Sequence, residues 1–527
     1  MKRSLRSLLL ATALVTISYS AAFAEMIYNR GNTTDPESLD PHKTSTVNEA
    51  HILRDMFSGL VMQDAKAELI PGAATSWTIS DDGKVYTFKL REGATWSNGD
   101  PVTADDFVYS FRRLEQPETK AEYASMMYVV KNAKEINEGK MKPEELGVRA
   151  VDANTFEVTL NAPVPYFLEM LTHQANYPVH KGSIDKLGDQ WTKPGNLLSN
   201  GAYVLAEFVP NDHIKLVKNP KFYEADQVKI DVVNYFPTQD RATALKQFKA
   251  GEIDSNDDMP LEQLAEMKAD LGDQVRIGPY LGTYYYPMRT DKEPWSNPKL
   301  RRAISLAIDR DFLAEKIWKN SMIPGYSMVP PGIEGYEPAI ADYAEMSQID
   351  REDEAKKIFT ELGISPEKPI KMDIRYNSSD NHKNTAVAIQ EQLKPFGIEV
   401  TLTSVDGLPA HYGFLEQKGD YDYARAGWIA DYKDPETFLG IARKASGNNY
   451  SNYNSPKFEE LMDKAAAAGG NAAERSKMLS EAERVLIDDL GVMPLLYYSY
   501  HDLVSSKLKG FEDNVMDVHP SRFISKE

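Results

Sequence analysis

The stretch PIKMDIRYNSSDNHKNTAVAIQEQLKPFGIEVTLTSV, residues 369–405, decides the fold class of the chain. Its first nine residues predict a strand, the segment TAVAIQEQLKPFG predicts a helix ended by Gly397, and its last eight residues predict a second strand. A strand, a helix and a strand in this order indicate a β-α-β unit and therefore an α/β protein. Ligands of α/β proteins collect at the carboxyl ends of strands, beside helix N-termini, and the predicted loop SSDNHKN at this position contains His382.

A β-hairpin followed by a helix is predicted closer to the N-terminus, in residues 76–111. The hairpin turns at Asp81-Asp82-Gly83, between two runs of alternating side chains. The helix after it begins at the N-cap Thr103, and Asp106 three residues later completes a capping box.

A segment rich in Gly, Pro and Asn at about 180–202 indicates a boundary within the chain. After it, the pattern predicts strands at 203–208 and 213–217, a helix ended by Gly251, and a further helix with the N-cap Asn297. The sequence therefore indicates two α/β lobes, each with a sheet.

Composition and charge narrow the classes of function. The 527 residues are 42% apolar and 26% charged, which is ordinary for a globular protein, and the net charge of −19 argues against nucleic acid and anionic membranes as partners. The absence of cysteine excludes disulfides, thiol nucleophiles and thiolate metal sites. No GxSxG, P-loop or dinucleotide-binding motif occurs, and none of the nine histidines lies three or four residues from another. A zinc site assembled from distant segments stays open, whereas carboxylate pairs among 79 acidic residues are too common to indicate a glycosidase.

Residues 1–24 predict a targeting segment. Three basic residues among the first six precede the apolar run 8–17, and small residues at positions 22 and 24 predict cleavage after Ala24. The apolar run is too short to span a bilayer stably, and a retained membrane anchor is the alternative. Since no cysteine follows the cleavage point, a lipid anchor through that residue is excluded. We expect an exported protein of the periplasm, or a secreted one.

The stretch ARAGWIADYKDP, residues 424–435, places the cation Arg425 six positions before the anion Asp431. Three interpretations compete: a buried ion pair, half of a catalytic site, or a clamp for a ligand charged at both ends. In one extended strand the two residues would lie about 20 Å apart, which rules out a direct ion pair. Gly427 leaves backbone N–H and C=O groups open to a strand-like partner, so an extended peptide agrees with the third interpretation. The alternative is that Asp431 is an ordinary cap or turn residue at the start of a helix.

Tyrosine occurs 28 times, with clusters at Tyr280 and 284–286 and in the segment LLYYSYHD, residues 495–502. Neighbouring residues of a strand point to opposite faces of the sheet, so three consecutive tyrosines place at least one ring on each face. These rings either belong to a strand with one face in the core or line a binding cleft, where they offer apolar area and a polar tip.

Several motifs of the chain, taken in their order, resemble those of a known family. The chain resembles the periplasmic oligopeptide-binding proteins, which belong to the peptide/nickel class (family 5) of solute receptors for ATP-driven importers. The similarity covers nearly all of the chain after residue 24. The shared motifs are LDPHK (39–43), the segment 76–111, NGAYVL (200–205), KNPKFY (218–223), LRRAISLAIDRD (300–311), VPP (329–331), YNSSDNHK (376–383) and ARAGWIADYKDPETFL (424–439).

The resemblance implies a two-lobed periplasmic solute-binding fold of the α/β class (type II, cluster C) that closes on an extended peptide. Lobe I would be discontinuous, an extra domain would be inserted in it, and lobe II would follow. The expected bounds are 25–58, 183–280 and 496–527 for lobe I, 59–182 for the inserted domain and 281–495 for lobe II.

The resemblance also implies roles for individual residues. Asp431 would bind the α-ammonium group of the peptide, and Arg425 and His382 would receive its carboxylate end. The other expected contacts are the backbone of Gly427, Trp428, Ile429 and Ala430, which would pair with the peptide main chain, and the side chains of Val47, Tyr123, Tyr280 and Tyr285, which would face the cleft.

The chain departs from the family pattern at several positions. A disulfide of several relatives would join the positions of Gly282 and Ile429, and charged pocket positions of the family correspond to Glu416, Trp318 and Pro287. The accepted peptide length is therefore open.

These inferences predict a monomeric receptor without catalytic residues, cofactor or metal ion. Its partners would be a short peptide and the permease and ATPase subunits of an inner-membrane ABC importer, and no nucleic acid. Within the family, a murein tripeptide, a haem or nickel chelate, or an opine is the alternative cargo. Other classes that stay open are a secreted peptidase or glycosidase and a periplasmic chaperone or sensor that presents peptide to a membrane receptor.

Overall fold

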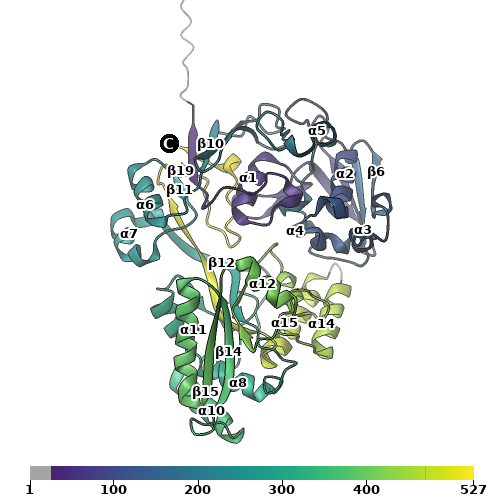
Figure 1. Ribbon diagram of the computed structural model, residues 1–527. Helices are drawn as coiled ribbons and strands as arrows, with labels where there is room; N and C mark the ends of the chain where they lie inside the picture. The colour runs from purple at the N-terminus through teal and green to yellow at the C-terminus, as the bar shows by residue number, and fades with distance from the viewer. Residues whose placement is uncertain (1–24, 469–470) are drawn as a thin grey trace, which may run out of the picture.

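The computed structural model describes residues 25–468 and 471–527 and has two lobes (Figure 1). The predicted targeting segment lies outside the described residues. None of the helices within these ranges is long and apolar enough to cross a membrane. We call lobe I the part with α1 (Val47–Met56), α6 (Arg241–Ala250) and α7 (Leu264–Leu271), and lobe II the part with α8 (Pro298–Ala307), α11 (Asp380–Leu393) and α15 (Ala472–Asp488).

A nine-stranded mixed sheet extends through both lobes in the order β17-β12-β18-β11-β1-β10-β9-β8, with β13 also paired to β18. Its longest strands, β12 and β18, have 12 residues each, are antiparallel, and run from lobe I into lobe II (Figure 1). The bounds are β1 (Ile27–Gly31), β8 (Tyr203–Val209), β9 (His213–Lys218), β10 (Val232–Phe236), β11 (Ser255–Asn256), β12 (Val275–Tyr286), β13 (Met322–Pro324), β17 (Ala426–Ile429) and β18 (Met493–Val504). The strands predicted at 203–208 and 213–217 and the helix ended by Gly251 are confirmed.

A four-stranded antiparallel sheet, in the order β4-β5-β7-β6, lies beside lobe I. Its strands and helix are β4 (Ala74–Ile79), β5 (Val85–Leu90), β6 (Val148–Asp152), β7 (Thr155–Thr159) and α2 (Ala104–Glu115). The predicted hairpin is β4-β5, and the predicted capping box is present, because the Thr103 N–H donates to Asp106 Oδ2 at 2.8 Å. The smaller elements of this half are β2 (Val61–Gln63), β3 (Leu69–Pro71), α3 (Ala133–Asn137), α4 (Phe167–Met170), α5 (Lys181–Leu187), β19 (Leu508–Lys509) and β20 (Ser525–Lys526).

The β-α-β unit of residues 369–405 is confirmed in lobe II. Strand β14 (Ile370–Asn377) is parallel to β15 (Ile398–Val405), α11 connects them, and β16 (Tyr423–Ala424) joins the other side of β14. The loop before the helix is shorter than predicted, because α11 begins at Asp380 and the Lys383 N–H already donates to the Ser379 carbonyl. His382 therefore lies in the first turn of the helix and not in a loop.

The helix predicted after Asn297 begins as expected, since the Asn297 side chain accepts from the Lys299 N–H. It ends at Ala307, because Ile308 is extended and Asp309 caps the next helix, α9 (Arg310–Phe312). The remaining helices of lobe II are α10 (Gln348–Glu361), α12 (Leu408–Glu416), α13 (Glu436–Leu439) and α14 (Pro456–Ala467).

Two large hydrophobic cores support the two halves. One includes residues of β1, α1 and the four-stranded sheet, and the other includes residues of β14, α8 and α15. Tyr432 of the second half packs into the first core, so the lobes are in contact in this conformation.

Candidate functional site

A cavity of about 660 Å³ lies between the lobes, within the usual range for a site that encloses a small ligand. Both lobes contribute to its wall. Of the eleven residues predicted from the sequence, nine border it: Val47, Tyr123, Tyr280, Arg425, Gly427, Trp428, Ile429, Ala430 and Asp431.

Strand β17 forms one wall of the cavity, and it is the edge strand of the nine-stranded sheet. On its inner side the Ala430 N–H donates to the Leu281 carbonyl at 2.8 Å, and Trp428 lies opposite Thr283. Because the peptide groups of an antiparallel strand alternate in direction, those of Gly427 and Ile429 point away from β12. The hydroxyl of Tyr412 contacts the Gly427 N–H at 3.0 Å, whereas the free edge at Ile429 is open to a further strand.

Asp431 directly follows this strand and is half-buried at the cavity wall. Its carboxylate accepts one weak hydrogen bond, from the Tyr123 hydroxyl at 3.4 Å, and no ion pair of the described residues includes it. It does not cap α13, because the carboxylate of Asp434 accepts the Glu436 N–H there. Burial, only partly offset by Tyr123, raises the pKa of Asp431 to about 7. A cation beside this carboxylate would favour its ionised form and lower the pKa again.

Arg425 is a second charge without an ionic partner in the described part of the chain. Only 7% of it is exposed, and its guanidinium donates to the hydroxyls of Tyr412 and Tyr498 at 3.2 and 3.1 Å. The guanidinium also lies 5.2 Å from the centre of the Tyr284 ring. Arg425 and Asp431 do not pair with each other, so among the interpretations of the stretch 424–435 the buried ion pair is excluded.

Tyr285 and His382 are not among the residues that border the cavity. Tyr285 is 1% exposed and packs in the core of lobe II, opposite Ala426 of β17. His382 lies behind Tyr284, whose hydroxyl is 3.2 Å from its Nδ1. Burial, together with the charge of Arg425, lowers the pKa of His382 to about 3, so the imidazole is neutral at pH 7.

The two positions that correspond to the family disulfide are neighbours in space. Gly282 of β12 lies directly opposite Ile429 of β17. A Cβ atom at Gly282 would lie 2.5 Å from Ile429 Cδ1, so the isoleucine side chain already occupies this space. An apolar contact therefore takes the place of a covalent bridge beside the cavity.

Sequence reasoning did not identify several residues of the wall. Tyr412 and Tyr498 hold Arg425 and Gly427, and Arg54 of α1 reaches the cavity from lobe I. The tyrosine-rich segment that contains Tyr498 was a recognisable signal. No local pattern marks Tyr412 or Arg54, because each reaches the wall only through the packing of its helix.

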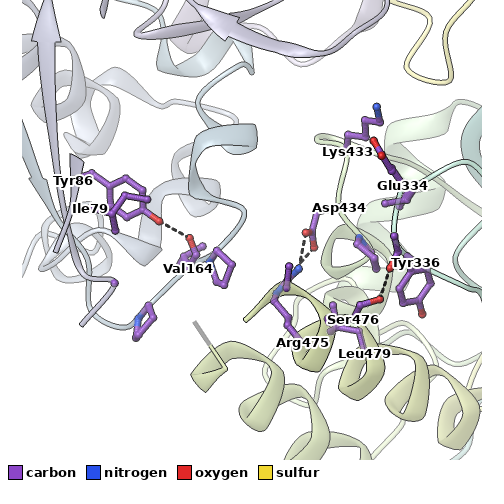
Figure 2. A pocket seen from close by; sticks show the side chains of 18 residues that line it. Ile79, Tyr86, Val164, Glu334, Tyr336, Lys433, Asp434, Arg475, Ser476 and Leu479 are labelled. Atoms are coloured by element: carbon purple, nitrogen blue, oxygen red, sulfur yellow. Dashed lines mark hydrogen bonds and ion pairs between the residues drawn. The ribbon is translucent and has the colours of Figure 1, made fainter. Parts of the chain in front are cut away.

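The lobes also meet beside the cavity, where the Tyr166 and Tyr432 rings stack with centroids 5.3 Å apart. The guanidinium of Arg475 lies 5.1 Å from the centre of the Tyr166 ring and donates to both carboxylate oxygens of Asp434 at 2.7 Å. A separate cavity of about 600 Å³ lies here between the β4-β5 hairpin and α15 (Figure 2). None of the eleven predicted site residues borders it, so these contacts hold the lobes together and are distinct from the candidate site.

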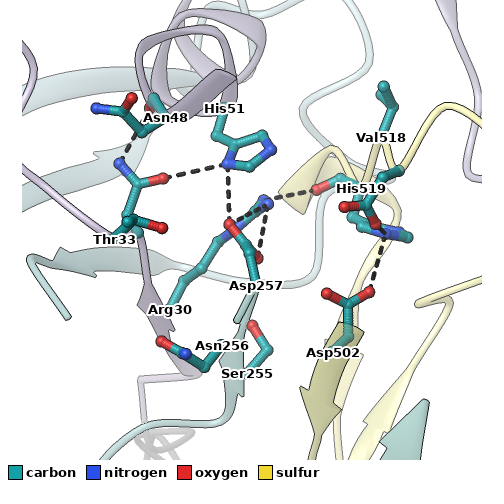
Figure 3. Close-up of polar contacts among 12 residues, drawn as sticks. Arg30, Thr33, Asn48, His51, Ser255, Asn256, Asp257, Asp502, Val518 and His519 are labelled. Atoms are coloured by element: carbon teal, nitrogen blue, oxygen red, sulfur yellow. Dashed lines mark hydrogen bonds and ion pairs between the residues drawn. The ribbon is translucent and has the colours of Figure 1, made fainter. Parts of the chain in front are cut away.

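One group within residues 25–468 and 471–527 has the donor atoms for a metal ion: Asp502, Asp517 and His519 (Figure 3). Burial and the neighbouring Asp517 raise the pKa of Asp502 well above its ordinary value, which favours its neutral form. Arg30 donates to the His519 carbonyl at 3.0 Å and pairs with Asp257 at 3.4 Å. A positive charge, that of Arg30, thus already lies beside the group. The geometry agrees better with a polar network that fixes the C-terminal segment to lobe I than with a metal site.

Comparison with known proteins identifies the family. Residues 68–450 match the family model of the bacterial extracellular solute-binding proteins, family 5. The chain is 38% identical over 488 residues to the periplasmic oligopeptide-binding protein OppA of Salmonella typhimurium. The aligned region covers 92% of this chain and 89% of that protein.

Solved structures of the same family have the same fold. The unliganded open form of the periplasmic murein tripeptide-binding protein MppA superposes with a TM-score of 0.83 at 34% identity, covering 96% of this chain and 98% of that one. Haemophilus influenzae OppA in complex with the peptide RPPGFSPFR gives a TM-score of 0.81 at 35% identity, covering 96% and 99%. The predicted two-lobed α/β solute-binding fold is thus confirmed, and the chain belongs to the family 5 bacterial extracellular solute-binding proteins.

Proposed function

We propose that the protein binds short extended peptides and delivers them to an ATP-driven importer as its periplasmic receptor. One observation carries the proposal: the free edge of β17 runs along a cavity between the lobes that is also lined by Asp431 and Arg425, neither of which forms an ion pair with a described residue. A peptide in extended conformation has an ammonium group, a carboxylate and unpaired amides, and it would complement Asp431, Arg425 and the β17 edge in turn.

The expected energies agree with a receptor of broad tolerance. A hydrogen bond to a charged group contributes about 1.5–3 kcal/mol, whereas micromolar binding needs about 8 kcal/mol in total. The Asp431 contact is therefore necessary and insufficient, and main-chain pairing with β17 and closure of the lobes supply the rest. Since main-chain groups are the same in every peptide, many side chains would be accepted.

The related proteins support the wider proposals. The relatives described above are periplasmic proteins, and one was solved with a bound nonapeptide. We propose a periplasmic monomer, released by cleavage after Ala24, that interacts with permease and ATPase subunits. The family consists of solute-binding proteins, and we propose that this member catalyses no reaction.

The proposed division of the chain keeps the sequence-based bounds 25–58, 183–280 and 496–527 for lobe I, 59–182 for the inserted domain and 281–495 for lobe II. It is supported by the four-stranded sheet, which pairs only within the inserted segment, and by the core of lobe II. A murein tripeptide is the second candidate cargo, because the MppA fold matches over nearly the whole chain.

Acetylation of the peptide N-terminus tests the proposal directly. An acetyl group removes the ammonium charge, so the Asp431 carboxylate would lose its partner inside the cavity. We expect titration calorimetry to give a dissociation constant at least about tenfold higher for an acetylated peptide than for the free one, which corresponds to about 1.4 kcal/mol. Equal affinity for the two peptides would overturn the assignment of Asp431.

Peptide affinity should also depend on pH, because the ammonium group requires an ionised Asp431. With a pKa of about 7, the carboxyl group takes up a proton as the pH falls, and affinity should decrease by about tenfold for each unit below pH 6. Above about pH 8 the peptide amino group loses its own proton, so affinity should be highest between about pH 7 and 8. Calorimetry from pH 5 to 9 measures this profile, and an unchanged affinity at pH 5 would contradict it.

A further inference from the structure

Arg54 is a further charged residue of the cavity wall, and none of the described residues forms an ion pair with it. It lies on α1, the helix of lobe I whose first residue, Val47, borders the cavity. The side chain is half-buried and its Nε is fully buried without a hydrogen bond. A side-chain hydrogen bond links Arg54 to Tyr177, and no ion pair of the described residues includes it. An arginine cannot lose its proton under physiological conditions, so this positive charge is permanent.

The groups around Arg54 do not neutralise it. Burial, and then the charge of Arg54, lower the pKa of His173 to about 3, so this histidine is neutral. The rings of Tyr177 and Tyr280 are close enough for the charge of Arg54 to oppose the rise that burial causes in their pKa values. Aromatic and neutral groups therefore surround the guanidinium.

Two acids, one beside Arg54 in α1 and one on the cavity wall, already have other partners. Asp55, the next residue of α1, accepts from the Ser521 N–H at 2.8 Å and from the Tyr235 hydroxyl at 2.8 Å. Asp517, which borders the cavity, lies 2.9 Å from His519 Nε2. A charge that is partly removed from water without an anionic partner is unfavourable, so the cavity favours a ligand that brings an anion to Arg54.

We propose that Arg54 is a second carboxylate subsite of the cavity and that the protein therefore prefers peptides with an acidic group at that position. The inference rests on the proposed function. Arg54 belongs to lobe I, whereas Arg425 belongs to lobe II, so the two cations would contact a ligand from opposite walls of the cavity. Planar guanidinium groups bind carboxylates through two parallel hydrogen bonds, which gives such a subsite geometric selectivity.

The carboxylate could belong to an acidic side chain or to the end of the peptide, and matched ligands distinguish the two. Alanine peptides of two to five residues are compared with versions that carry Glu or Gln at each position, and with versions amidated at the C-terminus. For the wild type we expect Glu to bind at least about fivefold more tightly than Gln at one position, or the free acid to bind more tightly than the amide by the same factor.

The variant Arg54→Met should abolish that ratio, and Arg54→Lys should retain part of it. The exposed Arg149, which pairs with Glu157 in the inserted sheet, provides a matched control, and Arg149→Met should leave the ratio unchanged. A purely structural role of Arg54 would change the affinity of all peptides by one factor and keep the ratio constant.

Two results would overturn the inference. One is a wild type that discriminates neither Glu from Gln nor acid from amide, and the other is an Arg54→Met variant that retains the wild-type ratio. The proposed function fails separately, when the unmodified alanine peptides do not bind at all, and in that case the subsite is rejected together with it.

Discussion

Replacing Asp431 with asparagine is expected to weaken the binding of short peptides about a hundredfold. The substitution keeps the shape of the side chain and removes the charge that opposes the peptide ammonium group. A hydrogen bond between charged groups contributes about 1.5–3 kcal/mol, and an ammonium group left unpaired in an enclosed cavity adds a further cost, so a loss of about 2.7 kcal/mol is expected. Titration calorimetry with a free tripeptide or tetrapeptide measures this change.

The folded state of the Asp431→Asn protein should be unaffected or more stable at pH 8. Because burial raises the pKa of this carboxyl group in the folded protein, its ionisation destabilises the fold as the pH rises above the ordinary value, and asparagine removes that cost. Asp420, an exposed carboxylate paired with Lys292, is the control, and Asp420→Asn should leave peptide affinity unchanged. Full affinity in Asp431→Asn at an unchanged melting temperature would reject the proposed clamp.

Replacing Gly427 with valine is expected to reduce peptide affinity at least tenfold and to lower the melting temperature. A Cβ atom at this position would lie 2.5 Å from the Tyr498 hydroxyl, which accepts a hydrogen bond from Arg425 at 3.1 Å. Overpacking of this kind costs about 1–3 kcal/mol of stability, and the valine side chain would also occupy the edge of β17 that a peptide would approach. Calorimetric unfolding and peptide titration measure the two effects.

The losses of peptide affinity and of melting temperature should both increase with the size of the new side chain. Gly427→Ala should lie between the wild type and the valine variant, because only the Cβ atom is added. Gly413 of α12 has no atom within 4 Å of an added Cβ, so Gly413→Ala is a control for the loss of a glycine in the same lobe. If Gly427→Val binds peptide as the wild type does, the edge of β17 is not part of the site.

The sequence predicted the elements of this fold where local patterns decide them. The β-α-β unit of residues 369–405 and the capping box at Thr103 depend on contacts between residues close in the chain, and both are present. The start of α11 was placed too late, because Asp380 and Asn381 are weak helix formers whose place depends on the turn that Ser379 begins. His382 was consequently placed in a loop.

Local patterns say less about the candidate site. A shared ligand for Arg425 and Asp431 was one of three interpretations of their spacing, and the family resemblance favoured it; both residues border the cavity. Tyr285 was assigned to the cleft by resemblance, yet it is buried in the core of lobe II. Arg54 lies more than 370 positions from β17 in the chain, and no pattern within α1 indicates that the folded chain would bring it to the same cavity.

The two strands that run through both lobes have a mechanical consequence. Strands β12 and β18 lose their regular register between Pro279 and Thr283, at the level of Tyr280. Pairing is weakest there, so rotation of one lobe against the other would concentrate its bending in these few residues and leave both hydrophobic cores intact. Tyr280 also borders the cavity, so the residues at which the strands would bend also form part of the cavity wall. A bound ligand that contacts the Tyr280 ring would therefore act directly on the angle between the lobes, and no change in the hydrophobic cores would be needed.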